Sequence, residues 1–368
     1  MPWTIPDHKA SAEEAIARGI ISGKVTDLAK VPEPQQSSEH QARVASLSIL
    51  NEVGAPDRVV TKPWAPNEYP PVIVVPPPVE PPVDPPPTGD WGDGKGFGSR
   101  PEGGVIHLRN ESDIVIDNKF FEGRWWMPNR GHNEHVCILL ENCTNITVRN
   151  CDFENVSEPV AVIGGSNILV EYTRTRGIVG PGSRVDEQTG NFLQTVGQPS
   201  NVRIRNNKIV ATTAVDPWNG QYHTMTEDVI SLFSASNCLV EFNQIDATGY
   251  SSDSGTGIIA GDANGDNHVV RGNSLLNPGQ VGLATAGGFG HRFYDNVIWK
   301  DADQNPGSGN TAAYFWGYNG NAIGDGRYEG NRAKWNGGGG FWNPGGAVNV
   351  GNDWDDDSLN RDDLVITL

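Results

Sequence analysis

The sequence predicts an all-β fold in which short parallel strands stack coil upon coil, and three observations support it. A short motif recurs along most of the chain, a second apolar strand precedes most of its copies, and one polar position is asparagine in five of them. Strands this short cannot bury a face alone. Stacked coils bury one continuous core and pair every strand with its equivalents above and below.

The motif is an apolar residue, any residue, an apolar residue, two polar residues, a slot for asparagine, any residue and an apolar residue. Residues 202–209 give its clearest form. The eight slot positions lie 22 to 36 residues apart and are Lys119, Cys151, Thr173, Asn207, Asn243, Asn273, Asn296 and Asn331. Because asparagine tolerates the left-handed backbone of a sharp turn, we expect these amides to stack as a ladder at one corner of the coils.

The second strand lies eight to ten residues before most copies of the motif. Its examples are Val136–Leu140, Val160–Val162, Val229–Leu232, Ile258–Ala260 and Val281–Leu283. Each repeat therefore holds two or three strands of period two, separated by Gly, Asn and Ser turns. A leucine-rich repeat would need a stricter period and a leucine signature, and a β-propeller would need four strands in a longer repeat.

Residues 101–335, about two thirds of the chain, resemble the right-handed parallel β-helix proteins of the pectate-lyase-like superfamily. The resemblance implies a right-handed parallel β-helix, which we place at residues 91–355, followed by a C-terminal tail at 356–368. It is specific for fold and not for function, because the superfamily includes pectate lyases, polygalacturonases, alginate epimerases and phage tailspikes.

Two segments of different composition precede the solenoid. Residues 1–68 are predicted to be an anchoring segment with two short helices, which begin at the capping boxes Ser11–Glu14 and Ser38–Gln41. Two short helices bury little surface, so we expect this segment to fold against a partner, with a flexible tail as the alternative. The proline density of residues 69–90 predicts a stiff polyproline II linker with a rise of about 3.1 Å per residue.

Charge and cysteine content limit the partners. The net charge of −18 disfavours nucleic acid and anionic lipid, and no run reaches the roughly 18 to 20 apolar residues of a membrane helix. The first residues lack a basic-then-apolar signal pattern, so we expect no signal peptide. We therefore expect the four cysteines to be reduced, mostly buried thiols, with a Cys143–Cys151 bridge as the alternative; they are Cys137, Cys143, Cys151 and Cys238.

Catalytic signatures of the resembled enzymes are mostly missing. The chain has Gly131-His132-Asn133 and Arg203-Ile204-Arg205 but lacks the Asn-Thr-Asp motif of polygalacturonases, and the epimerase and pectate lyase patterns are also absent. Generic carboxylates remain as candidate catalytic residues: Glu227, Asp228, Asp253 and Asp262. Glu227 and Asp228 open a strand, and the other two follow one coil later.

Parallel stacking brings equal coil positions to about 4.8 Å. Glycoside hydrolysis uses two carboxylates about 5 to 9.5 Å apart, so these side chains are candidates for such a pair. The alternative is that they are turn residues bonded to backbone amides. No metal site is predicted at His132, Glu134 and His135, which lack a third-ligand pattern. A Ca²⁺ site at Asp353–Asp357 is the alternative to a solvated acidic tail.

Aromatic residues gather in the C-terminal third, among glycines and asparagines. The candidate carbohydrate-binding residues are Trp299, Trp316, Trp335 and Trp342. Flat rings with amide neighbours suit the C–H faces and hydroxyls of sugars. The alternative, which is compatible with the first, is that these rings cap the open end of the solenoid.

Two functions follow from this organisation. An anchor, a stiff linker and a β-helix without a signal peptide are typical of a phage tail component, a tailspike or minor tail protein. We expect such a protein to attach to other tail proteins through residues 1–68, to form a homotrimer in the virion and to bind host surface polysaccharide. The alternative is a polysaccharide lyase or glycoside hydrolase. No cofactor is predicted for either.

Overall fold

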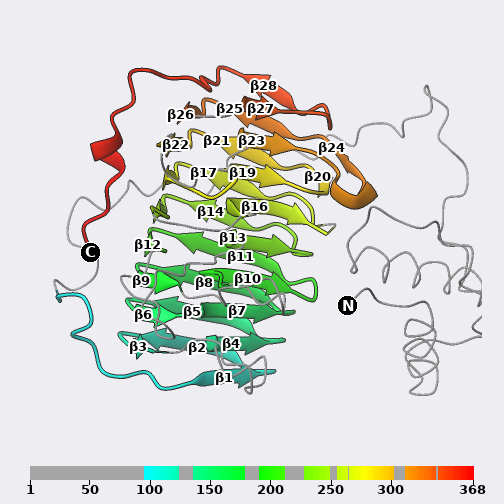
Figure 1. The fold of residues 1–368 in the computed structure, drawn as a ribbon. Helices are drawn as coiled ribbons and strands as arrows, with labels where there is room; N and C mark the ends of the chain where they lie inside the picture. The colour runs from blue at the N-terminus through cyan, green and yellow to red at the C-terminus, as the bar shows by residue number, and fades with distance from the viewer. Residues whose placement is uncertain are drawn as a thin grey trace, which may run out of the picture. The chain divides into compact units, whose positions relative to one another are not determined.

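The described part of the chain is a right-handed parallel β-helix, which confirms the predicted fold class (Figure 1). The computed structural model describes residues 95–123, 136–178, 190–211, 228–248, 255–263, 265–301, 311–336 and 339–368. The predicted anchor at 1–68 and linker at 69–90 lie outside these residues.

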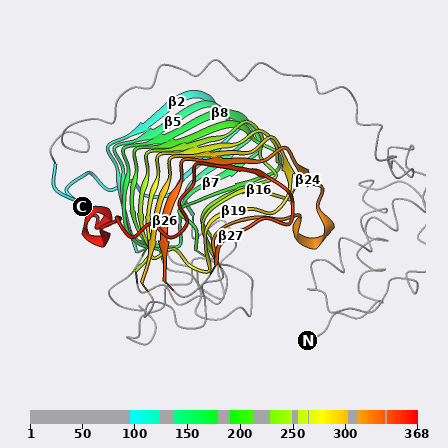
Figure 2. The ribbon, with the colours of Figure 1, turned by 90° about the horizontal axis from the view of Figure 1, so that it is seen from above.

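Three parallel sheets form the sides of the coil, as the view along the stack shows (Figure 2). The first sheet has the strands β1 (Ile106–Arg109), β4 (Val136–Glu141), β7 (Glu158–Ile163), β10 (Leu193–Val196), β13 (Asp228–Phe233), β16 (Thr256–Asp262), β19 (Val281–Thr285), β23 (Thr311–Phe315) and β27 (Gly339–Trp342). The second sheet has the strands β2 (Ser112–Asp117), β5 (Thr144–Arg149), β8 (Ser166–Glu171), β11 (Ser200–Arg205), β14 (Leu239–Glu241), β17 (Val269–Arg271), β21 (Arg292–Tyr294), β25 (Arg327–Glu329) and β28 (Val348–Val350).

The third sheet completes each coil. Its strands are β3 (Phe120–Glu122), β6 (Asp152–Val156), β9 (Arg174–Ile178), β12 (Lys208–Val210), β15 (Gln244–Asp246), β18 (Ser274–Leu276), β22 (Val297–Lys300) and β26 (Arg332–Trp335). A small ladder of β20 (Gly288–Phe289) and β24 (Ile323–Gly324) projects from the side of the stack (Figure 2). No described helix is long and apolar enough to cross a membrane.

Side-chain alternation builds the core. In β11 the side chains of Val202 and Ile204 are fully buried, whereas Arg203 between them is exposed. Successive side chains of a strand point to opposite faces, so each coil sends its apolar positions into one interior. The result is a single apolar cluster that runs from Ile116 to Ala347. The four cysteines are buried thiols.

The asparagine ladder is confirmed. Nδ2 of Asn207 donates to Oδ1 of Asn243 at 2.9 Å, and the same bond repeats through Asn273 and Asn296 to Asn331. Thr173 extends the ladder at one end and Asn352 at the other. Each of these amides is also bonded to backbone groups, so the ladder leaves few buried polar atoms of this corner unsatisfied.

The left-handed residue of this turn is not the ladder asparagine, as the sequence suggested, but the residue before it. Asn206 has φ 53° and Phe242 has φ 55°, whereas the asparagines that follow them have negative φ. A second ladder, which the motif did not predict, joins Asp113, Asn145, Asn167 and Asn201 on the exposed start of the second sheet. Asn167 and Asn201 themselves are left-handed there.

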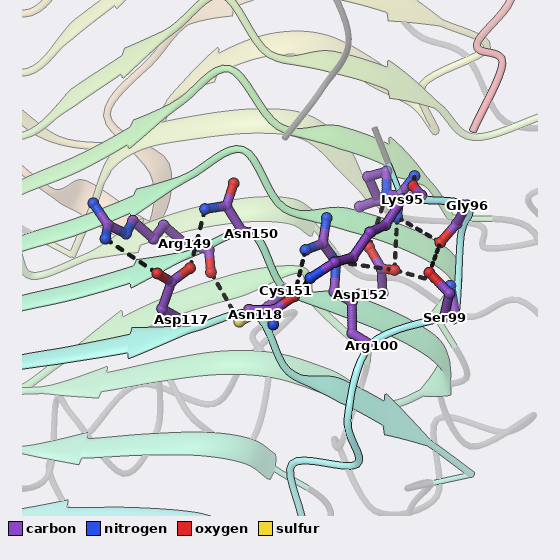
Figure 3. A network of polar contacts seen from close by, with 12 residues as sticks. Lys95, Gly96, Ser99, Arg100, Asp117, Asn118, Arg149, Asn150, Cys151 and Asp152 are labelled. Atoms are coloured by element: carbon purple, nitrogen blue, oxygen red, sulfur yellow. Dashed lines mark hydrogen bonds and ion pairs between the residues drawn. The ribbon is translucent and has the colours of Figure 1, made fainter. Parts of the chain in front are cut away.

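The first described residues bind the third sheet through a buried ionic network (Figure 3). Asp152 is fully buried and accepts from Arg174 Nη2 at 2.7 Å and from the backbone N–H of Gly98 at 2.9 Å. Arg100 Nε lies 3.2 Å from the same carboxylate. Buried charges are tolerated only when paired and hydrogen-bonded, so this network fixes residues 95–100 on the stack.

The last residues run back along the same sheet (Figures 1 and 2). Arg361 Nε donates to Asp301 at 2.8 Å, and Lys208 Nζ donates to the carbonyl of Thr367 at 2.8 Å. The segment 351–368 therefore covers part of the third sheet rather than projecting from the end of the solenoid. The part of the third sheet under this segment is therefore not open to a ligand.

Candidate functional site

The outer face of the first sheet carries most of the predicted site residues that the structure describes. Several of its strands begin with a break in the alternation of inward and outward side chains. Cys137 and Ile138 of β4 both belong to the core cluster, as do Val229 and Ile230 of β13. Two successive inward residues break the alternation, so the residue before each pair points outward. Val136 fits this rule, because it packs in a separate outer cluster with Leu139 and Ala161.

The strand register places an equivalent outward residue on each successive coil. Val136 pairs with Glu158, Asp228 with Thr256, and Thr256 with Val281. Asn191 takes the same place before β10, since Leu193 pairs with both Val160 and Ile230. The first outer column therefore contains Val136, Glu158, Asn191, Asp228, Thr256, Val281, Thr311 and Gly339.

Two more columns share this face. The central column contains His107, Leu139, Ala161, Gln194, Ser231, Ile259, Ala284, Tyr314 and Trp342. The third column includes Arg109, Glu141, Ile163, Val196, Phe233 and Asp262. The face thus changes along the axis from apolar, through amides and carboxylates, to aromatic rings.

The register separates two of the predicted catalytic carboxylates. Asp228 opens β13 and pairs with Thr256, whereas Asp262 ends β16 and pairs with Phe233. They lie on adjacent coils but at opposite ends of the strands, so they do not share the coil position that the sequence analysis expected. Asp228 is buried and Asp262 is partly exposed. Glu227 and Asp253 lie outside the described residues.

The charges of Asp228 and Asp262 nevertheless both affect the pKa of one side chain, Tyr314. Burial raises the pKa of the Tyr314 phenol well above 10, and the negative charges of Asp228 and Asp262 raise it further. Tyr314 packs over Ile259 and Ala284, whose smaller side chains leave the ring room on the face. The phenol therefore stays protonated at neutral pH and is a hydrogen-bond donor rather than a base.

Glu158 is the site residue that the sequence did not single out. Its side chain is 6% exposed, and burial raises its pKa to about 8. It lies two coils before Asp228 in the first column, about 10 Å away along the axis, with Asn191 between them. A signal was present, because both acids directly precede an apolar strand, but only the register shows that they share a column.

The aromatic end of the face is a packed group of four rings. The ring centroids of Trp316 and Trp342 lie 4.9 Å apart, those of Trp316 and Tyr318 5.2 Å, and those of Tyr314 and Trp342 6.3 Å. Trp342 is 48% exposed and Tyr318 is 43% exposed, so the group presents ring surface to solvent. We call these four residues the aromatic group.

The other two predicted tryptophans lie elsewhere. Trp299 is in β22 of the third sheet, where its Nε1 donates to Asp301 at 2.7 Å. Trp335 is in β26, is 5% exposed and packs with the ammonium of Lys300 5.1 Å from its ring centre. Their register positions on the third sheet separate them from Trp316 and Trp342, so the predicted four tryptophans do not form one site.

The end of the solenoid is capped by different rings from those that are exposed. Phe341 and Trp354 stack with centroids 5.3 Å apart and pack against the core, and Phe341 also contacts Tyr328 at 4.6 Å. The capping interpretation therefore holds for these inner rings, whereas carbohydrate binding by the exposed rings stays a prediction. The inner rings cap the core, and the aromatic group faces outward.

The acidic run at Asp353–Asp357 is engaged by basic side chains. Lys334 Nζ binds Asp355 at 2.7 Å and Asp357 at 2.6 Å, and Arg332 Nε binds Asp356 at 2.6 Å. Hydrogen bonds from the hydroxyl of Ser358, from Arg332 and from the backbone N–H of Ser358 lower the pKa of Asp356 to about 2. Among the residues that the structure describes, no group of three or more side chains is arranged to hold a metal ion.

Comparisons with known proteins give distant similarities to solved structures. No family model and no curated protein matches the chain. The surface adhesin PfbA of Streptococcus pneumoniae is 12% identical over 70% of this chain and 79% of its own, with a TM-score of 0.38. Endo-xylogalacturonan hydrolase of Aspergillus tubingensis is 13% identical over 69% and 83%, with a TM-score of 0.38.

A third solved structure is more distant. The A-module of mannuronan C-5 epimerase AlgE4 of Azotobacter vinelandii is 12% identical over 67% of this chain and 74% of its own, with a TM-score of 0.23. Two of these proteins are named as enzymes and one as an adhesin. At this level of similarity, the activity and ligands of these proteins are not carried over to this chain.

Proposed function

We propose that the protein binds a glycan chain along the outer face of its first sheet. The aromatic group carries this proposal, because exposed rings beside polar side chains suit the two sides of a sugar. Tyr314 contributes a protonated hydroxyl, and Gln194 and Ser231 lie further along the same column. A chain-like ligand fits a face whose columns repeat about every 4.8 Å over successive coils.

We propose further that this binding serves a phage tail component, attached through residues 1–68 to other tail proteins and spaced by the linker at 69–90. The organisation of the sequence supports this role, and a homotrimer is its expected assembly. Mass spectrometry of purified particles would detect the chain among tail proteins, and sedimentation would give its oligomeric state. Absence from particles whose genome encodes it would contradict the role.

Glycan binding is tested with two matched tryptophan variants. Trp342→Ala removes an exposed ring of the aromatic group, and Trp299→Ala removes an indole from the third sheet. On host surface polysaccharide we expect at least tenfold weaker binding for Trp342→Ala, about 1.4 kcal/mol, and little change for Trp299→Ala. Equal losses in both folded variants would show that the aromatic group is not the binding site.

A second function, glycan hydrolysis, is favoured by the pair Glu158 and Asp228. Burial keeps the Glu158 carboxyl protonated at neutral pH, as a general acid requires, and Asp228 lies two coils away on the same face. The axial separation of about 10 Å is close to the range of inverting hydrolases. Loss of glycan cleavage in both Glu158→Gln and Asp228→Asn, with binding retained, is expected; cleavage retained in either would exclude this pair.

A further inference from the structure

The outer face of the second sheet has an apolar column along its middle. One outward residue of each strand pairs with its equivalents through all nine strands of this sheet. Five of these positions are aliphatic: Val115, Leu169, Leu239, Val269 and Val348. Val115 is 56% exposed and Val348 48%, and the three residues between them are partly exposed. Aliphatic side chains therefore meet solvent from the first strand of this sheet to the last.

Polar side chains border this column on both sides. On one side lies the exposed amide ladder, which joins β2, β5, β8 and β11. On the other side, acidic residues and arginines alternate over the six strands from β2 to β17. They bind one another within the chain, since Arg205 lies 2.9 Å from Glu171 and Arg271 lies 2.8 Å from Glu241. An apolar strip with a polar rim is typical of a surface that another protein covers.

The charges of this sheet nearly cancel, although the chain as a whole is acidic. The chain has 45 acidic residues and 27 lysines and arginines, for a net charge of −18. The nine strands of the second sheet contain five acidic residues and six arginines. Two copies of such a chain repel each other, and the repulsion is weakest where the facing surfaces have no net charge. The second sheet is thus a surface on which a second copy can approach without local repulsion.

The described terminal segments leave this face open. Residues 95–100 and 351–368 lie on the third sheet, and the exposure of Val115 and Val348 shows that the second sheet is uncovered at both ends. From β2 to β25, each connection from the second sheet to the third consists of two residues, such as 118–119 and 330–331. Figure 2 shows the strands of this sheet along one side of the coil.

The face is also large enough for a stable interface. Nine strands about 4.8 Å apart, with outward positions spread over about five residues, give a face of about 43 Å by 16 Å, roughly 700 Å². A standard interface between two proteins buries about 800 Å² on each partner. A second copy that covers the whole sheet would therefore bury an area of the standard size.

We propose that copies of this chain associate through the outer face of the second sheet. The inference rests on the homotrimer proposed above and names the surface that joins its copies. Burial of the aliphatic column favours association, and the ion pairs beside it are already formed within each copy. The first sheet is a different side of the coil, so the face proposed to bind glycan stays accessible in the assembly. Each copy then adds one glycan-binding face, which raises the avidity for a polymeric ligand.

Charge variants of the full-length protein test the apolar column. Leu239→Glu introduces a charge within the column, Val115→Glu does so at its most exposed position, and Val196→Glu is the matched control on the first sheet. In sedimentation of the folded variants, we expect dissociation constants at least tenfold higher for the two second-sheet variants and an unchanged one for Val196→Glu. Because each copy has a net charge of −18, added salt should strengthen association. Equal association of all three variants, or association that salt weakens, overturns the assignment.

Cysteine cross-linking of the full-length protein locates the contact. The four native cysteines are buried, so an introduced surface thiol reacts selectively. Val115→Cys places a thiol on the second sheet, and Val196→Cys places one at a 38% exposed position of the first sheet. With a bismaleimide, we expect covalent oligomers of Val115→Cys and only monomers of Val196→Cys on a denaturing gel. If the wild type sediments as an oligomer but both variants or neither cross-link, the surface is wrong and the homotrimer stands. A monomeric wild type overturns both and leaves glycan binding, which is measured separately, intact.

Discussion

The imidazole rings of His268 and His291 stack inside the solenoid, with centroids 5.0 Å apart and planes 17° apart. Nδ1 of His268 accepts from the backbone N–H of Cys238 at 3.2 Å, and Nδ1 of His291 accepts from that of His268 at 3.4 Å. Both rings are buried in successive coils, where accepting from the coil below requires an unprotonated Nδ1.

This stack makes the stability of the fold depend on pH. Burial lowers the pKa of His291 to about 4, compared with 6.5 for a histidine exposed to solvent. Between these values the unfolded chain binds more protons than the folded one, so acidification from pH 6.5 to 4 stabilises the unfolded state by about 3 kcal/mol. Relative to His291→Asn, the wild type should lose that much in urea unfolding over this interval. A pH-independent difference would contradict the prediction.

The contribution of Glu158 to the stability of the fold should depend on pH in the opposite direction. Its pKa is raised from 4.5 to about 8 by burial, so between these values the folded chain binds the extra proton. Stability from this group is present below pH 4.5 and is lost as the pH rises to 8, by about 4 kcal/mol. The measurement is the difference in unfolding free energy between wild type and Glu158→Gln at pH 5 and pH 8. Between pH 5 and pH 8, the unfolding free energy of the wild type should fall relative to that of Glu158→Gln. A constant difference would show that the carboxyl is not held protonated.

The two asparagine ladders should differ in their contribution to stability. Asn273→Ala removes a fully buried amide that bonds Asn243, Asn296 and the carbonyl of Val240, and it leaves their buried partners unsatisfied. We expect a loss of about 2 to 4 kcal/mol from these groups. Asn167→Gly removes two bonds of the exposed ladder, tolerates the left-handed backbone there (φ 56°) and should cost less than about 1 kcal/mol. Equal losses in chemical unfolding would show that burial does not distinguish the ladders.

The C-terminal segment should be released by one substitution. Arg361→Ala removes the bond to Asp301, the carboxylate that also accepts from Trp299 and Asn277. A partly exposed ion pair contributes about 0 to 1 kcal/mol, so the melting temperature should change little. Limited proteolysis should nevertheless cut residues 351–368 sooner than in Arg327→Ala, which breaks an ion pair on the second sheet. Unchanged cleavage would show that other contacts hold the segment.

The fold could be predicted from the sequence because its determinants are local and repeated. The slot asparagines lie in register in five successive coils, so the motif located the buried ladder. The motif did not say which residue of the turn is left-handed, since Phe242 and Tyr172 take that conformation beside several asparagines and glycines. Burial and ladder geometry, not residue type, decide this at each coil.

The site was less predictable because it depends on register between coils of unequal length. Asp228 and Asp262 are one coil apart in sequence, yet connections of different length place them at opposite ends of their strands. Similarly, Trp335 and Trp342 are close in sequence but lie on the third and first sheets. The sequence analysis did not single out Glu158, because only the register and the burial of its side chain distinguish it.

The buried ladder has a direction, because every Nδ2 in it donates to the coil that follows. Each coil therefore offers the same acceptor to the coil before it and the same donor to the coil after it. A whole coil can be gained or lost in evolution without leaving a mismatched bond at the junction. Such a chain can change its length in steps of about 4.8 Å, while the structures at its two ends stay the same.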